Sequence, residues 1–150
     1  MTPSDKCIEL IKQFEGLSLK AYICPAGIAT IGYGNTRWQD NRRVELGEQI
    51  TMSGATKLLQ FYVNKFASDL PDMKLNQNQF DAIVSFVYNV GMANFKFSTL
   101  FKLIKANPQD PNIRDEFMKW TKARDTKTDS LRILKGLVKR REAEANLYFA

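Results

Sequence analysis

The spacing of apolar residues changes at Gly16, and this change constrains the fold more than any other feature of the chain. Before Gly16, apolar residues recur at every third position, as on one face of a helix: Ile8, Ile11 and Phe14. Ser4 or Asp5 can cap this helix, and Gly16 can end it. In residues 17–36, by contrast, side chains expected to face the core alternate with side chains expected to face solvent, on either side of a turn at 25–27. This pattern predicts a small antiparallel sheet. The chain therefore begins with a helix that runs directly into a sheet.

The rest of the chain is predicted to be mostly helical. A long helix runs from Thr51 to about Leu70, before Pro71, and a strongly apolar helix runs from Asn76 or Gln77 to Gly91. The other predicted segments are a short strand around 43–45, helices at about 95–106 and 111–122, a polar loop at 122–130 and a last helix after Gly136.

This order of elements predicts an α+β fold in a single domain. A small sheet lobe spans about 16–50, a connecting helix spans about 52–70, and a helical lobe comprises about 71–150 together with the N-terminal helix. Apolar residues make up 44% of the chain and charged residues 25%, which is the usual globular range. The cleft between the lobes is where we expect an extended polymer such as a polysaccharide to bind.

Glu15 is the strongest candidate for a catalytic residue. It lies at the predicted C-terminal end of the first helix, where the helix dipole and apolar neighbours both favour the protonated carboxyl. A carboxylic acid that keeps its proton near neutral pH can act as a general acid. The alternative is an ordinary solvated carboxylate at a helix end.

Three separated motifs resemble those of the phage-type lysozymes, the endolysin muramidases of glycoside hydrolase family 24. The first runs from Phe14-Glu15-Gly16 to Thr30-Ile31-Gly32-Tyr33-Gly34, and the second is Asn78–Gly91 followed by Phe97-Ser98-Thr99-Leu100. The third is Gly136-Leu137-Val138-Lys139-Arg140-Arg141-Glu142-Ala143-Glu144. Together they cover most of the chain in the family's order.

This resemblance implies a lysozyme-like fold and cleavage of the β-1,4 bond between N-acetylmuramic acid and N-acetylglucosamine in peptidoglycan. The family's catalytic residues correspond to Glu15, Cys24 and Thr30, with Glu15 protonating the leaving oxygen. Further substrate-binding positions are implied at Tyr33, Gly34 and Asn35 and at a C-terminal arginine near Glu15, either Arg140 or Arg141. The family generally inverts, which requires about 6.5–9.5 Å between the acid and the opposing group.

The chain departs from the family at two of these positions. Cys24 stands where many members have Asp, so its role as nucleophile, water positioner or spectator stays open. A disulfide with Cys7 is one alternative, and a free thiol at Cys7 is the other. Asn35 stands where the family usually has His, and the chain contains no His at all. Imidazole catalysis and a His-containing metal site are thereby excluded, and we expect no metal or cofactor.

The positive charge is concentrated near the C-terminus. The formal charge is +6, and residues 119–141 hold nine Lys or Arg against two acids. Such a stretch suits an anionic partner, and charge alone does not choose among peptidoglycan peptides, lipopolysaccharide, anionic lipid and nucleic acid. We expect a monomer that does not use nucleic acid as a partner. A lytic transglycosylase and a non-catalytic cationic protein that binds envelope or nucleic acid remain the alternative functions.

The N-terminus contains no secretory signal, and no window reaches the roughly 18 consecutive apolar residues of a membrane span. We therefore expect the protein to accumulate in the host cytoplasm and to reach the cell wall after another protein permeabilises the membrane.

Overall fold

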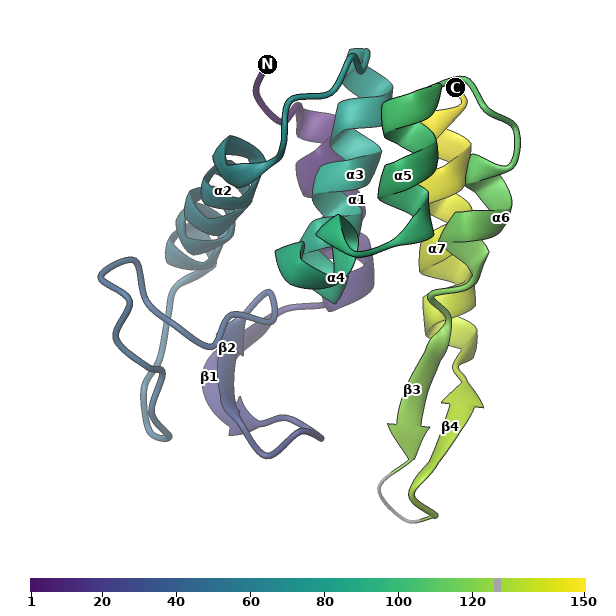
Figure 1. Ribbon diagram of the computed structural model, residues 1–150. Helices are drawn as coiled ribbons and strands as arrows, with labels where there is room; N and C mark the ends of the chain where they lie inside the picture. The colour runs from purple at the N-terminus through teal and green to yellow at the C-terminus, as the bar shows by residue number, and fades with distance from the viewer. Residues whose placement is uncertain (126–127) are drawn as a thin grey trace.

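The computed structural model describes residues 1–125 and 128–150. The described elements are, in order, α1 (Asp5–Glu15), β1 (Ser18–Ile23), β2 (Ala29–Gly32), α2 (Met52–Asp69), α3 (Gln77–Val90), α4 (Met92–Lys96), α5 (Thr99–Ala106), α6 (Ile113–Met118), β3 (Lys122–Asp125), β4 (Ser130–Ile133) and α7 (Lys135–Tyr148). Figure 1 shows helix α3 among the other helices, with the β1–β2 and β3–β4 hairpins extending from the same end of the helical part.

The helix-to-sheet transition predicted at Gly16 is confirmed. The Ser4 hydroxyl accepts the backbone N–H of Lys6, and Gly16, at φ +69°, donates its N–H to Lys12 O at the other end of α1. Strands β1 and β2 then pair antiparallel, with Tyr22 opposite Thr30, and their register is irregular between Ser18 and Tyr22. Gly16 allows this reversal because a side chain at positive φ would be strained.

The segment between β2 and α2 does not contain the strand expected around 43–45. Only isolated bridges form there, between Arg37 and Arg43 and between Lys20 and Gln49. The Glu48 carboxylate organises this segment: it accepts from Arg42 Nη2 at 2.8 Å, Trp38 Nε1 at 3.1 Å and the Glu45 N–H at 2.6 Å. These side-chain bonds add to separate backbone hydrogen bonds, such as Val44 N–H to Thr36 O and Trp38 N–H to Arg42 O, which do not join into the ladder of a regular strand.

Three helical predictions are corrected by the structure. The helix expected at 95–106 is two helices, because Ser98 takes an extended conformation and caps α5 by accepting the Phe101 N–H at 3.0 Å. The helix expected at 111–122 covers only Ile113–Met118. The last helix begins at Lys135, so Gly136 lies inside its first turn rather than before it.

The loop expected at 122–130 lies in an antiparallel hairpin. Strands β3 and β4 pair from Lys122–Ile133 to Asp125–Ser130, and Leu134 N–H continues the pairing to Thr121 O at 2.9 Å. Residues 126–127 of the predicted loop lie outside the described residues. Backbone pairing stabilises this segment although its side chains are largely polar.

The hydrophobic core is centred on α3. This helix is buried on most sides, and its residues belong both to the cluster with α5, α6 and α7 and to the cluster with α1 and α2. A third cluster joins Ile31 of β2 and Val44 to Leu58 and Tyr62 of α2. Helix α2 therefore packs against both the sheet segment and the helices, which is the arrangement expected of the connecting helix.

Candidate active site

Glu15 is the last residue of α1, and a buried arginine holds its carboxyl group. Arg140 Nη1 of α7 donates to Glu15 Oε1 at 2.7 Å; the Arg140 side chain is 3% exposed and that of Glu15 is 20% exposed. The ion pair joins residues 125 positions apart in the sequence. The carboxyl group is therefore fixed by one oxygen while still reaching solvent.

Gly34 packs against the other carboxyl oxygen of Glu15. A Cβ atom built on Gly34 would lie 2.6 Å from Glu15 Oε2, and Gly34 has φ +80°. Both observations require glycine at this position, because any side chain would collide with the carboxyl group and strain the backbone. The backbone of the loop after β2 thus lies in direct contact with the carboxyl group at the end of α1.

A buried network behind Arg140 holds its guanidinium in place. Arg140 donates from Nη2 to Ser85 O at 3.1 Å and from Nε to Glu144 Oε2 at 3.3 Å, and Ser85 Oγ donates to the same Glu144 oxygen at 2.6 Å. Arg141 Nε lies 3.0 Å from Glu144 Oε1. Glu144 is fully buried, and burial raises the pKa of its carboxyl while the two guanidinium groups oppose that rise.

The two candidate arginines are thereby distinguished. Arg140 contacts Glu15, whereas Arg141 Nη2 donates to Asn89 Oδ1 at 2.5 Å and its guanidinium lies over the Phe86 ring. Burial lowers the pKa of Arg141 to about 10. Arg141 supports the network and the rim of the site without touching Glu15.

Cys24 and Thr30 lie close together in the sheet hairpin. Cys24 follows β1 and donates its N–H to Ile28 O at 3.0 Å, while Thr30 Oγ1 of β2 donates to the same carbonyl at 2.9 Å. Hydrogen bonds from the Ile28 backbone and then from the Thr30 side chain lower the pKa of the Cys24 thiol. Both cysteines are free, and Cys7 is buried in the core, so the alternative of a Cys7–Cys24 disulfide is not realised.

A pocket of about 490 Å³ opens beside Glu15. Its walls come from the end of α1, the loop after β2, and helices α2 and α3; the lining residues are Glu15, Gly34, Asn35, Thr36, Arg37, Asn41, Tyr62, Lys65, Phe66, Tyr88 and Asn89. Neither Cys24 nor Thr30 lines this pocket. The pocket is concave and half polar, as expected for a site that binds a hydroxylated ligand.

Asn35 connects the pocket to the core through Tyr88. Asn35 Nδ2 donates to Tyr88 Oη at 3.1 Å, and that hydroxyl donates to Tyr33 O at 2.8 Å. Burial raises the pKa of Tyr88, which therefore stays a neutral donor. Asn35 Oδ1 is buried and has no hydrogen-bond partner within the described residues. At the position where the family usually has His, this chain thus has an amide whose Nδ2 is hydrogen-bonded and whose Oδ1 is not.

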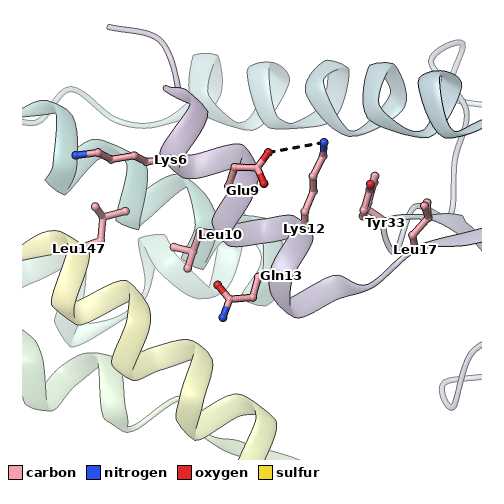
Figure 2. Close-up of a pocket in the computed structure, with 8 residues that line it drawn as sticks. All are labelled: Lys6, Glu9, Leu10, Lys12, Gln13, Leu17, Tyr33 and Leu147. Atoms are coloured by element: carbon pink, nitrogen blue, oxygen red, sulfur yellow. Dashed lines mark ion pairs between the residues drawn. The ribbon is translucent and has the colours of Figure 1, made fainter.

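The Tyr33 ring lies in a different hollow from Glu15. Figure 2 shows Tyr33 beside Lys12 on the outer side of α1, in a hollow of about 650 Å³ that extends to Leu147 of α7. Lys12 Nζ lies 5.5 Å from the centre of the ring and 3.9 Å from Glu9 Oε1. This hollow is the larger of the two but lacks the Glu15–Arg140 pair, so the smaller pocket is the candidate active site.

Comparison with known proteins agrees with this geometry. The family model described as phage lysozyme matches residues 12–144. The chain belongs to the phage lysozyme family. The lysozyme-like α+β architecture predicted from the sequence is confirmed by the solved structures described next.

The chain is similar to several relatives over almost its whole length. An endolysin of Acyrthosiphon pisum secondary endosymbiont phage 1 is 41% identical over 97% of this chain and 96% of its own. An endolysin from Escherichia coli O157:H7 phage FAHEc1 has a TM-score of 0.86 at 36% identity, covering 99% of this chain and 93% of its own. The muramidase domain of SpmX from Asticaccaulis excentricus has a TM-score of 0.84 at 31% identity, covering 98% and 97%.

In this phage lysozyme, several residues at the site were not predicted from the sequence. Glu144 and Ser85 hold Arg140, Tyr88 holds Asn35, and Tyr62 and Lys65 of α2 line the pocket. Glu144 ends the C-terminal motif that contains Arg140, and Tyr88 lies in the central motif, so a signal for these two existed. The α2 residues carry no comparable signal.

The phage lysozyme chain offers neither a metal cluster nor a membrane span among residues 1–125 and 128–150. No group of three or more metal-ligating side chains comes together there, and no helix is both long and apolar enough to cross a bilayer.

Proposed function

We propose that this chain is a muramidase of the endolysin class, which hydrolyses the β-1,4 bond between N-acetylmuramic acid and N-acetylglucosamine in peptidoglycan. The single observation that carries the proposal is Glu15, held by Arg140 at 2.7 Å beside Gly34 in an open pocket. Membership of the phage lysozyme family and similarity to endolysins and a muramidase domain support it.

Glu15 is the proposed general acid. Arg140 engages Oε1, which leaves Oε2, on the Gly34 side, to carry the proton to the leaving glycosidic oxygen. Gly34 is proposed to let the sugar approach the acid closely, and Asn35, which lines the pocket and is fixed to Tyr88 through Nδ2, is proposed to contact the sugar next to it. Arg140 and Arg141 are proposed as positioning residues for Glu15 and for the pocket rim, respectively. Tyr33 contributes through its carbonyl, which accepts the Tyr88 hydroxyl.

Thr30 and Cys24 are proposed to act on the water side of an inverting reaction. Such a reaction needs about 6.5–9.5 Å between the acid and the opposing group, so that a water molecule fits between them. Hydrogen bonds in the turn lower the pKa of Cys24, which favours the thiolate, and Thr30 bonds to the same turn. A thiolate would take the role that a carboxylate has in other members.

The cellular setting is proposed from the same family. The chain acts as one lysozyme-like domain and as a monomer, with a sheet lobe at about 16–50, a connecting helix at about 52–70 and a helical lobe formed by the rest. It reaches peptidoglycan after another protein opens the host membrane. The basic surface around β3, β4 and α7 contributes attraction to anionic lipid or lipopolysaccharide.

Replacement of Glu15 tests the proposal. Glu15→Gln keeps the shape and the contact with Arg140 but has no acidic proton, so we expect turnover of purified peptidoglycan to fall at least about 100-fold with thermal unfolding near that of the wild type. Glu9→Gln, on an exposed turn of the same helix, is the matched control and should retain activity. Undiminished turnover in Glu15→Gln would remove the general acid.

The products identify the reaction class. Mass spectrometry should find reducing muramic acid ends, because water attacks the anomeric carbon. Anhydro-muramic ends would instead assign the chain to lytic transglycosylases.

A further inference from the structure

Two cations line the Glu15 pocket without a carboxylate partner. Arg37, in the loop after β2, donates from Nη1 to Asn41 O at 3.0 Å, and Lys65 Nζ of α2 lies 5.8 Å from the centre of the Tyr62 ring. The ion pairs of the described residues include neither of them. Arg37 is half-buried as a residue, and the hydrogen bond of its guanidinium to Asn41 O is exposed, so the charged group can reach a ligand in the pocket.

The pocket as a whole carries an excess of positive charge. Glu15 is the one acidic residue among those that line it, and Arg140 already neutralises that carboxylate. Asp40 lies nearby, but its side chain is exposed and accepts the backbone N–H of Arg42 at 3.0 Å. Arg37 and Lys65 therefore contribute charge that nothing lining the pocket balances. Uncompensated cations in a concave site attract anions more strongly than the same cations on a flat surface.

Tyr62 brings the two cations to the same part of the pocket. Its ring is 8% exposed, and its hydroxyl is anchored on the carbonyl of Trp38. Trp38, whose carbonyl accepts the Tyr62 hydroxyl, directly follows Arg37 in the chain, and Lys65 Nζ lies 5.8 Å from the centre of the Tyr62 ring. Tyr62 thus contacts the backbone next to Arg37 through its hydroxyl and Lys65 through its ring, and all three residues line the same pocket.

The proposed substrate carries the matching anions. Each muramic acid residue bears a lactyl group whose carboxyl is free in bare strands and is joined to a stem peptide in intact strands. Stem peptides carry further free carboxylates. An arginine fork and a lysine ammonium are the side chains that bind carboxylates most strongly.

We propose that Arg37 and Lys65 form a carboxylate-binding subsite that recognises the acidic groups of the peptidoglycan strand next to the cleaved bond. This inference rests on the proposed muramidase function. The carboxylate comes from the lactyl group of a bare strand or from a stem peptide. The subsite makes the enzyme selective for acidic strands over neutral ones of the same length.

Binding to defined strands tests the subsite without turnover. Arg37→Gln, Lys65→Gln and the double variant are made in the Glu15→Gln background, and Kd is measured for three ligands: strands with stem peptides, bare strands produced by an amidase, and strands whose carboxyls are converted to amides. We expect about threefold weaker binding for each single variant and about tenfold for the double variant on acidic strands, with no change on amidated strands.

Lys57→Gln is the matched control, because it removes the same charge from an exposed position of the same helix. Arg37→Lys keeps the charge and should restore most of the affinity. Weakening on bare strands alone identifies the lactyl carboxylate, and weakening on peptide-bearing strands alone identifies a stem-peptide carboxylate. Weakening on both identifies a subsite that accepts either one. An equal loss in Lys57→Gln, or a loss that persists on amidated strands, would overturn the subsite.

The proposed function is tested separately in the same series. If the protein with Glu15 intact does not cleave peptidoglycan, the muramidase proposal fails whatever the Kd values are. If it cleaves while Arg37 and Lys65 behave as Lys57 does, only the subsite fails.

Discussion

Gly34 brings the backbone against the carboxyl of Glu15, the proposed general acid, more closely than a residue with a side chain could. Its Cα hydrogen occupies the place where a Cβ would meet Glu15 Oε2 at 2.6 Å. Glycine is therefore needed at position 34 for two reasons. The backbone there has a positive φ, and the Glu15 carboxyl can keep its position only if residue 34 has no side chain.

Gly34→Ala is therefore expected to affect activity more than stability. The added methyl group displaces the Glu15 carboxyl, and a shift of about 1 Å at a reacting group costs on the order of 100-fold in rate. Gly47→Ala is the control: Gly47 has φ +93° but nothing within 4 Å of its would-be Cβ, so it carries the same backbone strain alone. Turnover and thermal unfolding of both variants separate the two effects. Equal turnover in the two variants would contradict the contact.

The two thiols are expected to differ sharply in reactivity. Hydrogen bonds lower the pKa of Cys24, whereas burial raises that of Cys7, so Cys24 holds more thiolate at every pH near neutrality. Limited alkylation with iodoacetamide at pH 7 should label Cys24 first and Cys7 only after unfolding, as read by peptide mass spectrometry. Labelling of Cys7 at a comparable rate in the folded protein would contradict this difference. Cys24→Ser then reports its role, since wild-type turnover would make it a spectator.

At the scale of elements, the segment 37–50 is held by the Glu48 side chain together with isolated backbone bridges, and not by a continuous strand ladder. Glu48 binds Arg42, Trp38 and the backbone of Glu45 at once. The same segment supplies Arg37 and Asn41 to the pocket wall, so the shape of the pocket depends on the conformation of this segment.

The contribution of Glu48 is expected to depend on pH. The Arg42 guanidinium, the Glu45 N–H and the Trp38 N–H lower the pKa of Glu48 from 4.5 to about 2. An acid whose pKa falls on folding stabilises the protein above its unfolded pKa and loses that effect as pH falls through the folded pKa. The stability difference between wild type and Glu48→Gln should therefore be full at pH 7 and shrink between about pH 4.5 and 2. Urea unfolding at several pH values measures it, and a constant difference would contradict it.

Two of the wrongly predicted elements have identifiable reasons. Ser98 interrupts an otherwise continuous helical pattern because its hydroxyl can cap a new helix, a local signal that the apolar spacing hides. Strand β3, which lies in the segment predicted as a loop, has the sequence Lys-Ala-Arg-Asp and so resembles a polar loop in composition. A hairpin that is stabilised by its own backbone pairing leaves little trace in hydrophobic burial.

At the scale of the whole molecule, the arginines of α7 link the helical part to the candidate active site, because Arg140 pairs with both Glu15 and Glu144. Of the positive charge expected at the surface over 119–141, Arg140 and Arg141 are buried and paired with carboxylates. Lys119 pairs with Glu116, and Arg124 with Asp129. The exposed basic surface is thus weaker than the composition indicates, which disfavours a purely electrostatic binding protein.

Glu144→Gln is expected to disturb both stability and catalysis. It leaves Arg140 and Arg141 buried without the carboxylate they share, and loss of one partner from a buried ion pair costs about 3 kcal/mol or more. Arg140 is then free to shift away from Glu15. Glu142→Gln, on the exposed face of α7, is the control and should lie within about 0.5 kcal/mol of the wild type. Denaturant unfolding and turnover together check the result; a neutral Glu144→Gln would show that the network is dispensable.

The sequence by itself determined those features that depend on neighbours along the chain. The cap at Ser4, the stop at Gly16, the sheet hairpin that follows and the apolar α3 all follow from local spacing and from backbone preferences. The motif positions of Glu15 and Gly34 also came from the sequence, through the resemblance. Only the tertiary structure decided which arginine meets Glu15 and that α2 supplies Lys65 to the pocket. Both depend on packing between segments far apart in the chain, where a helical turn of about 100° per residue separates Arg140 from Arg141 and sends them to different partners.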